Sequence, residues 1–422
     1  MKNIIVTLKK ICGAVIFLVM GITAYSQTAD YVTFSGKIID AKNRNEIYYA
    51  TVSIPGTNIA TVSNSEGEFT IKFPRLPQPN ELEISHISYG IRRIPITFFN
   101  PAQSVVIELE PSAITLSEIR VNGASAKDIV MEAIRRIPYN YPENPMMLTG
   151  FYRESIKQRR NYISISEAVV DIYKSSYRQG FDSDRLKLNK ARQGVNVKKA
   201  DTLGVKFQGG PNISLMLDVA KYPHYLFYDL KFDYYEFTIM DMITVNNRAH
   251  YVISFKQNPQ IVDPLYLGQI YIDAENYAIT HAQFQLNLEN PSKAEWLFVR
   301  KKPLGVRFVP LSTFYLVNFT EQNGKYYFSY ARNELSFKTV WNRRLFSSKY
   351  HITAEMVITD RDTNDIVKFP KSETFKTSEA LIDAASAFTD DDFWGNDNII
   401  KPEEDIEKAI QRYGKKLKRT YP

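Results

Sequence analysis

Five histidines are the first candidates for metal binding or acid–base chemistry, but their spacing is typical of neither. They are His86, His224, His250, His281 and His351. No two of them lie within five residues of each other, so the chain contains neither HExxH nor HxH, the local patterns that hold a metal. A site assembled from histidines on neighbouring strands stays an alternative. We predict no metal ligand and no bound cofactor.

Catalytic motifs that a sequence shows locally are absent as well. The chain has no G-x-S-x-G elbow, no Walker loop and no G-x-G-x-x-G, and its single cysteine, Cys12, lies in the N-terminal leader. The remaining acid–base candidates are the carboxylates Glu154, Glu167 and Asp171. A hydrolase built from them requires close carboxylates with perturbed pKa values. The sequence therefore favours a non-enzymatic binding protein, with a hydrolase as an alternative.

Two short motifs could bind an ion, but each also has a simpler interpretation as a turn. Gly209-Gly210-Pro211 leads into a short helix and could present backbone N–H groups to an anion, although a tight turn is the commoner use of such residues. Asp390-Asp391-Asp392 could attract Ca²⁺, but it lacks the spacing and the glycine of a calcium loop. We interpret the first as a turn and the second as an acidic surface turn.

The segment from Lys174 to Lys206 is rich in basic residues and shows little periodicity. We interpret it as a long solvated loop, with contact to lipid head groups or another polyanion as the alternative. The candidate contacts are Arg185, Lys187, Lys190, Arg192, Lys198 and Lys199. The net charge of +7 falls to +4 without the three lysines of the leader, which is too small to predict nucleic acid binding.

The N-terminus has the pattern of a cleavable signal peptide. Lys2, Lys9 and Lys10 precede the apolar run Ile11 to Ala24, and Ala24-Tyr25-Ser26 places small residues at a cleavage site. The apolar run is too short for a membrane span, which needs roughly 20 residues. We predict cleavage after Ser26 and no transmembrane helix in the mature chain. A mature chain without cysteine is typical of a bacterial periplasm or the periplasmic face of the outer membrane.

The stretch from Val32 to Phe73 predicts a small antiparallel β-sandwich, because short alternating apolar runs are separated by turn residues at regular intervals. It resembles the carboxypeptidase regulatory-like domain, a transthyretin-like sandwich. The resemblance is carried by Gly36, Asp40, Ala50, Val52, Gly56, Thr57, Asn64, Gly67 and Phe69. It implies an accessory module. The paired His and Glu ligands of the zinc peptidase that gave the module its name are missing here.

A linker and a helix follow the sandwich. Leu116 to Val121 resembles the segment that follows this module in TonB-dependent outer-membrane transporters, and a plain last strand or linker is the alternative. Ala126 to Ile137 has one apolar stripe at helical spacing, with Ser125 as N-cap and Pro138 at its end. We expect this amphipathic helix to pack onto the next domain.

From Leu148 to Asp360 the sequence predicts a long antiparallel meander. Three hairpins are expected around Asn246-Asn247, Glu275-Asn276 and Asn323-Gly324. Strands of about ten residues favour a large curved sheet, whose concave face needs a cover. The candidate cover is a short helix at 213–220, with Ile213, Leu215, Met216, Leu217 and Ala220 as possible lid residues. The hairpin at 268–279 resembles one in lipoprotein-carrier-like half-barrels, which implies a sheet with a helical lid that shelters acyl chains.

Together these features predict a mainly β protein that resembles Bacteroidetes-type exported proteins. The expected divisions are a signal peptide at 1–26, a sandwich at 27–112, a linker with its helix at 113–147, the large antiparallel domain at 148–378, and an acidic turn with a C-terminal helix at 379–422. We expect a binding or adaptor protein of the cell envelope that holds a lipid, another apolar ligand or a peptide. A structural partner of a TonB-dependent or other outer-membrane protein complex is a further alternative.

Overall fold

The computed structural model describes residues 31–101, 103–112, 125–178, 183–195, 209–299, 304–342, 347–364, 366–387 and 393–420. Three features discussed above lie outside these residues. They are the signal peptide at 1–26, the segment Leu116 to Val121, and the acidic turn Asp390-Asp391-Asp392.

The N-terminal part forms the predicted sandwich from two small sheets, with strand orders β4-β1-β7 and β3-β2-β5-β6. The strands are β1 (Tyr31–Asp40), β2 (Thr51–Ser53), β3 (Ala60–Val62), β4 (Glu68–Pro74), β5 (Glu81–His86), β6 (Tyr89–Pro95) and β7 (Val105–Leu109), with the short helix η1 (Ile96–Phe98) after β6. Ile38, Phe69 and Ile71 are fully buried between the sheets. The pairing is antiparallel except between β1 and β7, which run parallel.

The rest of the chain builds one sheet of eleven strands, in the order β11-β12-β13-β14-β15-β16-β17-β8-β9-β10-β18. The strands are β8 (Met146–Gln158), β9 (Asn161–Lys174), β10 (Arg185–Val195), β11 (Tyr235–Val245), β12 (Arg248–Gln257), β13 (Tyr266–Asp273), β14 (Ile279–Leu286), β15 (Val306–Gln322), β16 (Lys325–Trp341), β17 (Ser348–Asp362) and β18 (Ser386–Ala387). The sheet is curved and does not close into a barrel. The three predicted hairpins are confirmed as β11–β12, β13–β14 and β15–β16.

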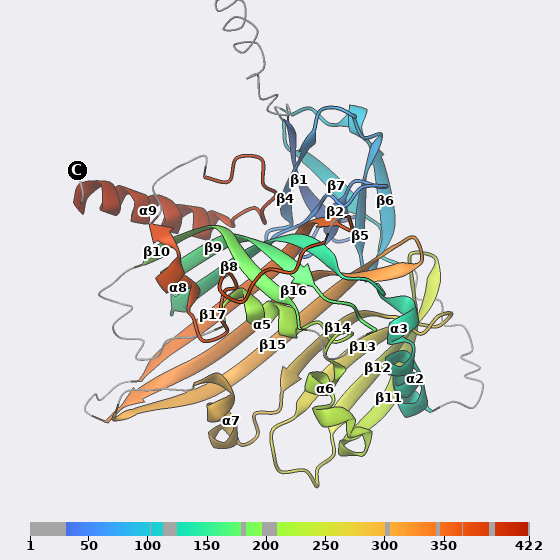
Figure 1. Ribbon diagram of the computed structural model, residues 1–422, viewed down its shortest axis with the longest axis vertical. Helices are drawn as coiled ribbons and strands as arrows, with labels where there is room; N and C mark the ends of the chain where they lie inside the picture. The colour runs from blue at the N-terminus through green and yellow to red at the C-terminus, as the bar shows by residue number, and fades with distance from the viewer. Residues whose placement is uncertain are drawn as a thin grey trace, which may run out of the picture.

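The order of strands shows the path of the chain through the sheet. It begins near one edge of the sheet with β8, β9 and β10, crosses to the opposite edge at β11, and returns strand by strand until β17 pairs with β8. The crossing segment carries the short helices α5 (Pro211–Met216), α6 (Pro223–Leu226), η2 (Tyr228–Leu230) and η3 (Phe232–Tyr234). Figure 1 shows this segment in front of the sheet. It is therefore the natural cover of one sheet face.

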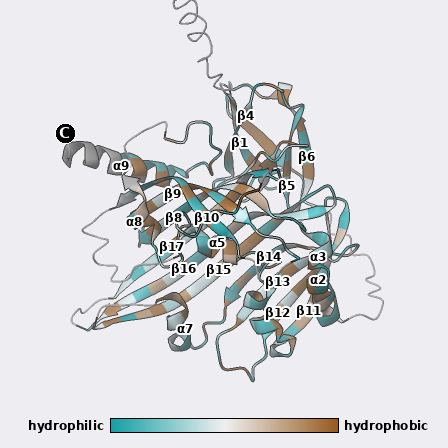
Figure 2. Ribbon diagram, in the orientation of Figure 1, coloured by the Kyte–Doolittle hydropathy of each residue, from teal (hydrophilic) through white to brown (hydrophobic). Residues whose placement is uncertain are grey.

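The two faces of the large sheet contact different parts of the protein. We call the inner face the one whose side chains, such as Tyr152 and Ala354, share a core with the crossing segment. On the outer face, Phe151 and Val357 pack against Val62 of the sandwich and Trp394 of the C-terminal segment. Figure 2 shows hydrophobic and hydrophilic residues along the same strands.

The remaining helices flank the sheet. They are α2 (Ala126–Arg135), α3 (Ile137–Asn140), α7 (Pro291–Phe298), α8 (Leu381–Ala384) and α9 (Glu404–Thr420). The predicted amphipathic helix is confirmed in α2, which begins with a capping box between Ser125 and Asp128 and packs into the inner core. The chain then turns directly into α3, with Pro138 in its first turn. No helix in the described ranges is both long and apolar enough to cross a bilayer.

Two predictions about individual elements are wrong. The expected helix at 213–220 is displaced and shorter, because α5 ends at Met216 and the residues after it form turns. The prediction of a basic loop is also wrong over 185–195, because the chain forms β10 there. The sequence Arg185-Leu186-Lys187-Leu188 alternates basic and apolar residues, which is the period of a strand, and a bulge after Leu188 interrupts that alternation.

Candidate functional site

A cavity of about 510 Å³ lies on the inner face, between the sheet and the crossing segment. Its floor comes from strands β8 and β13 to β17, and its roof comes from α5, α6 and the turns that follow them. The floor residues are Tyr152, Glu154, Tyr266, Phe284, Leu286, Tyr315, Asn333, Leu335, Ile352 and Ala354, and the roof residues include Ile213, Met216, Leu217, Val219, Tyr222, Tyr225 and Leu226. The volume falls in the range of roughly 300–1,000 Å³ that is usual for small-molecule sites.

Exposed apolar side chains mark the mouth of this cavity. Trp296 and Leu297 of α7 line it and are 71% and 42% exposed, and Tyr225 of α6 is 48% exposed. Met216 at the end of α5 is exposed as well. Apolar side chains gathered at one opening are uncommon on a surface that contacts only water. The cavity is therefore open to solvent between the crossing segment and α7.

A buried ionic cluster fixes the roof to the sheet. The Nζ of Lys174, at the end of β9, lies 2.7 Å from Asp184 and 2.6 Å from Asp218, a residue that follows α5. Tyr177 also donates a hydrogen bond to Asp218 at 2.6 Å. Burial acts to lower the pKa of Lys174, but the two carboxylates outweigh it and raise the pKa. Because Asp218 lies between the cavity residues Leu217 and Val219, this cluster holds the roof in place.

The predicted lid residues divide between the cavity and the adjoining core. Ile213, Met216 and Leu217 line the cavity. Leu215 and Ala220 are buried in the core beside it. All five therefore belong to the covering segment, and their role as a ligand lid stays a prediction.

The carboxylates proposed for a hydrolase do not meet. Glu154 lines the cavity on the inner face. Glu167 is fully buried on the outer face, where it pairs with two arginines. Along β9, Asp171 alternates with residues of the inner face, so its side chain lies on the outer face, as does that of Glu167. The three side chains thus supply no pair of carboxylates around one substrate position.

One row of side chains runs across the inner face from strand to strand, and its members on β16, β17 and β8 line the cavity. It consists of Asn333 on β16, Ala354 on β17, Glu154 on β8, Ser166 on β9 and Gln193 on β10, each paired with the next in the register. We call it the inner row. Tyr152 donates a hydrogen bond to Glu154 at 3.0 Å, and burial raises the pKa of Glu154 above its usual value. Asn333 Oδ1, Ser166 Oγ and Gln193 Oε1 are buried without a hydrogen-bond partner among the described residues.

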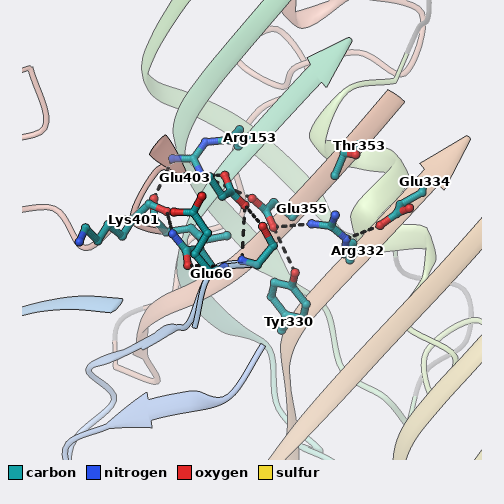
Figure 3. A network of polar contacts seen from close by, with 12 residues as sticks. Glu66, Arg153, Tyr330, Arg332, Glu334, Thr353, Glu355, Lys401 and Glu403 are labelled. Carbon is teal, nitrogen blue, oxygen red and sulfur yellow. Dashed lines mark hydrogen bonds and ion pairs between the residues drawn. The ribbon is translucent and has the colours of Figure 1, made fainter. Parts of the chain in front are cut away.

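On each of the same five strands, the residue directly before or after the inner-row residue lies on the outer face. These five residues form a second row. It consists of Arg332, Glu355, Arg153, Glu167 and Arg192, again paired in register from β16 to β10. We call it the outer row, and part of it is drawn in Figure 3. Its charges alternate, with ion-pair distances of 3.0, 3.5, 2.7 and 2.9 Å along the row. Burial acts to raise the pKa of Glu355, and Arg332 opposes it.

The outer row is covered by the sandwich and by the C-terminal segment. Arg153 donates a hydrogen bond to the Ile400 carbonyl at 2.7 Å. The Arg332 and Arg192 guanidinium groups lie 4.9 and 4.8 Å from the ring centres of Tyr49 and Trp394. A polar cavity of about 290 Å³ remains between the row, Glu66 of the sandwich and Glu403. These contacts join three parts of the chain that are distant in sequence.

The predicted basic contacts interact with this chain in the structure. Lys187 and Lys190 form ion pairs of 2.8 and 2.7 Å with Glu373 and Asp397. Arg192 belongs to the outer row, and Arg185 donates a hydrogen bond to the Phe369 carbonyl. Lys198 and Lys199 lie outside the described residues. A contact of this strand with a polyanion stays a prediction.

Comparison with known proteins gives a family for the first domain. Residues 34–121 match the CarboxypepD_reg-like domain. This match confirms the resemblance stated for the sandwich. No curated protein matches the chain.

Solved structures give weaker similarities. The chain is similar to a LolA superfamily protein from Nitrosomonas europaea, with 11% identity over 60% of this chain and 99% of that one and a TM-score of 0.23. It is also similar to a DUF1329 family protein from Desulfovibrio piger, with 8% identity over 58% of this chain and 96% of that one and a TM-score of 0.25. At these TM-scores, function has to be argued from the residues of this chain.

Proposed function

We propose that this protein binds an apolar ligand in the inner-face cavity and works in the cell envelope. The observation that carries the proposal is the cavity of about 510 Å³, lined mostly by apolar and aromatic side chains and bordered by exposed Trp296 and Leu297. The predicted signal peptide and the absence of cysteine after Cys12 support an exported, periplasmic location.

The sandwich and the large sheet have different roles in this proposal, because the sheet forms the cavity floor and the sandwich packs against its other face. The sandwich and the C-terminal segment cover the outer face, and none of their described residues lines the inner cavity. The sandwich therefore acts as an accessory domain that stabilises the back of the binding sheet. An outer-membrane protein that exchanges the ligand would meet the exposed mouth near Trp296.

Apolar burial supplies enough free energy for such binding. Each buried methylene contributes about 0.8 kcal/mol, so a chain with ten buried methylenes gains roughly 8 kcal/mol before the entropic cost of binding. Because about 8 kcal/mol corresponds to a dissociation constant near 1 μM, we expect single-chain amphiphiles of this length to bind no more tightly than that.

Two measurements test the proposal. Native mass spectrometry of protein purified from its own envelope should detect a co-purified lipid, and a fluorescent fatty-acid probe should bind the delipidated protein. Leu335→Trp should weaken probe binding at least tenfold, because the half-buried Leu335 lines the cavity floor. Leu311→Trp is the matched control, since Leu311 is 42% exposed and lies outside the cavity lining.

Some outcomes would reject this function. If neither lipid nor probe binds the wild-type chain, the cavity is not a binding site. If the wild-type chain instead co-purifies only with another protein, the structural-partner alternative is favoured. Equal loss of binding in both tryptophan variants would place the probe elsewhere on the surface.

A further inference from the structure

The inner row contains an ionisable group, Glu154, without a counter-ion among the residues that the structure describes. Glu154 lines the largely apolar cavity, and no cation among the described residues forms an ion pair with it. In the described part of the chain, the Glu154 carboxylate accepts one hydrogen bond, from Tyr152. By contrast, Glu167 and Glu355 on the outer row each pair with two arginines. A carboxylate in an apolar site is costly unless a cation or several donors meet it.

A second acceptor lies near Glu154 on the cavity floor. Asn333 Oδ1 is buried and has no hydrogen-bond partner in the described part of the chain. Between the two residues in the register lies Ala354, whose methyl group leaves space above the sheet. Ser214 Oγ, on the covering helix α5, is likewise buried without a partner. The floor thus offers two acceptors around one small residue.

The surrounding rings also favour positive charge. Tyr152, Tyr222 and Tyr315 line the same cavity, and the face of a tyrosine ring attracts an ammonium group. An ammonium carries three donors and no acceptor, which matches a carboxylate that accepts one hydrogen bond from Tyr152 and an amide oxygen, Asn333 Oδ1, that has no donor among the described residues. A carboxylate head group would instead face repulsion from Glu154.

We infer that the cavity selects amphiphiles with an ammonium head group, which Glu154 and Asn333 bind while the apolar chain fills the space beneath α5 and α6. The inference rests on the proposed function and names the ligand class. Glu154 is the residue that determines head-group specificity. Asn333 supplies the second acceptor.

Three probes of equal chain length test the inference: dodecylamine, dodecanol and dodecanoate, each below its micelle concentration at pH 7.5. Their affinities are measured by displacement of a neutral fluorescent probe from the full mature chain. We expect the amine to bind at least tenfold more tightly than the alcohol, and the acid to bind most weakly. In Glu154→Gln, the amine and the alcohol should agree within about threefold, while alcohol affinity stays near the wild-type value.

Alcohol binding shows that the variant is folded, and Glu289→Gln is the matched control. Glu289 is exposed and lies outside the cavity lining, so its loss should leave the amine preference intact. If the wild-type chain binds amine and alcohol equally, the inference is wrong while the proposed function stands. If Glu154→Gln keeps the amine preference, Glu154 does not bind the head group. If no probe binds, the proposed function itself fails.

Discussion

Arg332 and Asn333 are neighbours in β16, yet their side chains belong to surfaces of opposite chemistry. Arg332 begins the outer row, in which charges alternate across five strands and each ion pairs with its neighbour. Asn333 begins the inner row, which crosses the same strands, and within the described residues Asn333 Oδ1 and Ser166 Oγ have no hydrogen-bond partner. Because side chains alternate across a strand, a shift of one residue separates the two rows.

The difference between the rows indicates what each face does. Charges that each form an ion pair with the next and are covered by the sandwich and the C-terminal segment fix how the domains join. Polar atoms left unpaired beside a cavity are costly in the free protein, and a ligand can satisfy them. The sheet therefore has a structural face and a binding face, and substitutions on the two faces should have different effects.

The largest expected effect is on the outer row, in Arg153→Met. Arg153 is 2% exposed, and its loss leaves Glu167 and Glu355 with one fewer cation and the Ile400 carbonyl without its donor. We expect the free energy of unfolding to fall by about 3–5 kcal/mol, measured by urea denaturation. Arg178→Met is the control, because its pair with Glu143 is exposed and should contribute below about 1 kcal/mol. A loss below 1 kcal/mol for Arg153→Met would contradict a structural role for the row.

A smaller loss is expected at the roof of the cavity, in Asp218→Asn. The buried Lys174 would keep Asp184 but lose one of its two carboxylates. We expect about 1–3 kcal/mol lower stability and weaker probe binding, because Leu217 and Val219 beside it line the cavity. Asp233→Asn, at an exposed pair with Lys127, controls for the change of charge. Unchanged probe binding in Asp218→Asn would show that this cluster does not position the roof.

Much of the fold can be predicted from the sequence because its signals are local. Turn residues such as Asn246 and Asn323, both with positive φ, define hairpins that the structure confirms. The capping box at Ser125 likewise gives the start of α2. The pairing of β17 with β8 depends on residues some 200 positions apart, and no local pattern encodes it.

The lack of a local signal for long-range pairing also explains why the sequence alone does not reveal some parts of the site. Along β8, Phe151 and Arg153 lie on one face, and Tyr152 and Glu154 lie on the other. This alternation shows that both faces of β8 are used, but the partners of Arg153 follow only from strand order and register. Asn333 is one polar residue in a long strand, and its importance depends on the cavity above it. Glu154 and Glu167 are both acid–base candidates in the sequence, but their side chains lie on opposite faces of the sheet.

The inner row also predicts a pH dependence of ligand binding. Burial raises the pKa of Glu154 above its usual 4.5, so its proton is lost at a higher pH than for an exposed glutamate. Amine affinity should therefore rise by about tenfold as pH increases through this pKa, while dodecanol affinity stays constant. The other titratable groups lining the cavity are Asp263, Glu334, Tyr152, Tyr222, Tyr225, Tyr228, Tyr235, Tyr266 and Tyr315. Glu154→Gln should remove the dependence, and its persistence in that variant would assign it to one of these groups.

The smallest effect is expected at the edge of the outer face and tests where the charged row ends. Lys187 and Arg192 lie on β10, but the Lys187 side chain is 40% exposed and pairs with Glu373, whereas Arg192 is 11% exposed and pairs with Glu167. Lys187→Gln should change the unfolding free energy by less than about 1 kcal/mol, because water screens its ion pair. Arg192→Gln is the matched variant and should cost more, because it leaves the buried Glu167 with Arg153 alone. Equal losses in the two variants would mean that burial does not distinguish the row from its surroundings.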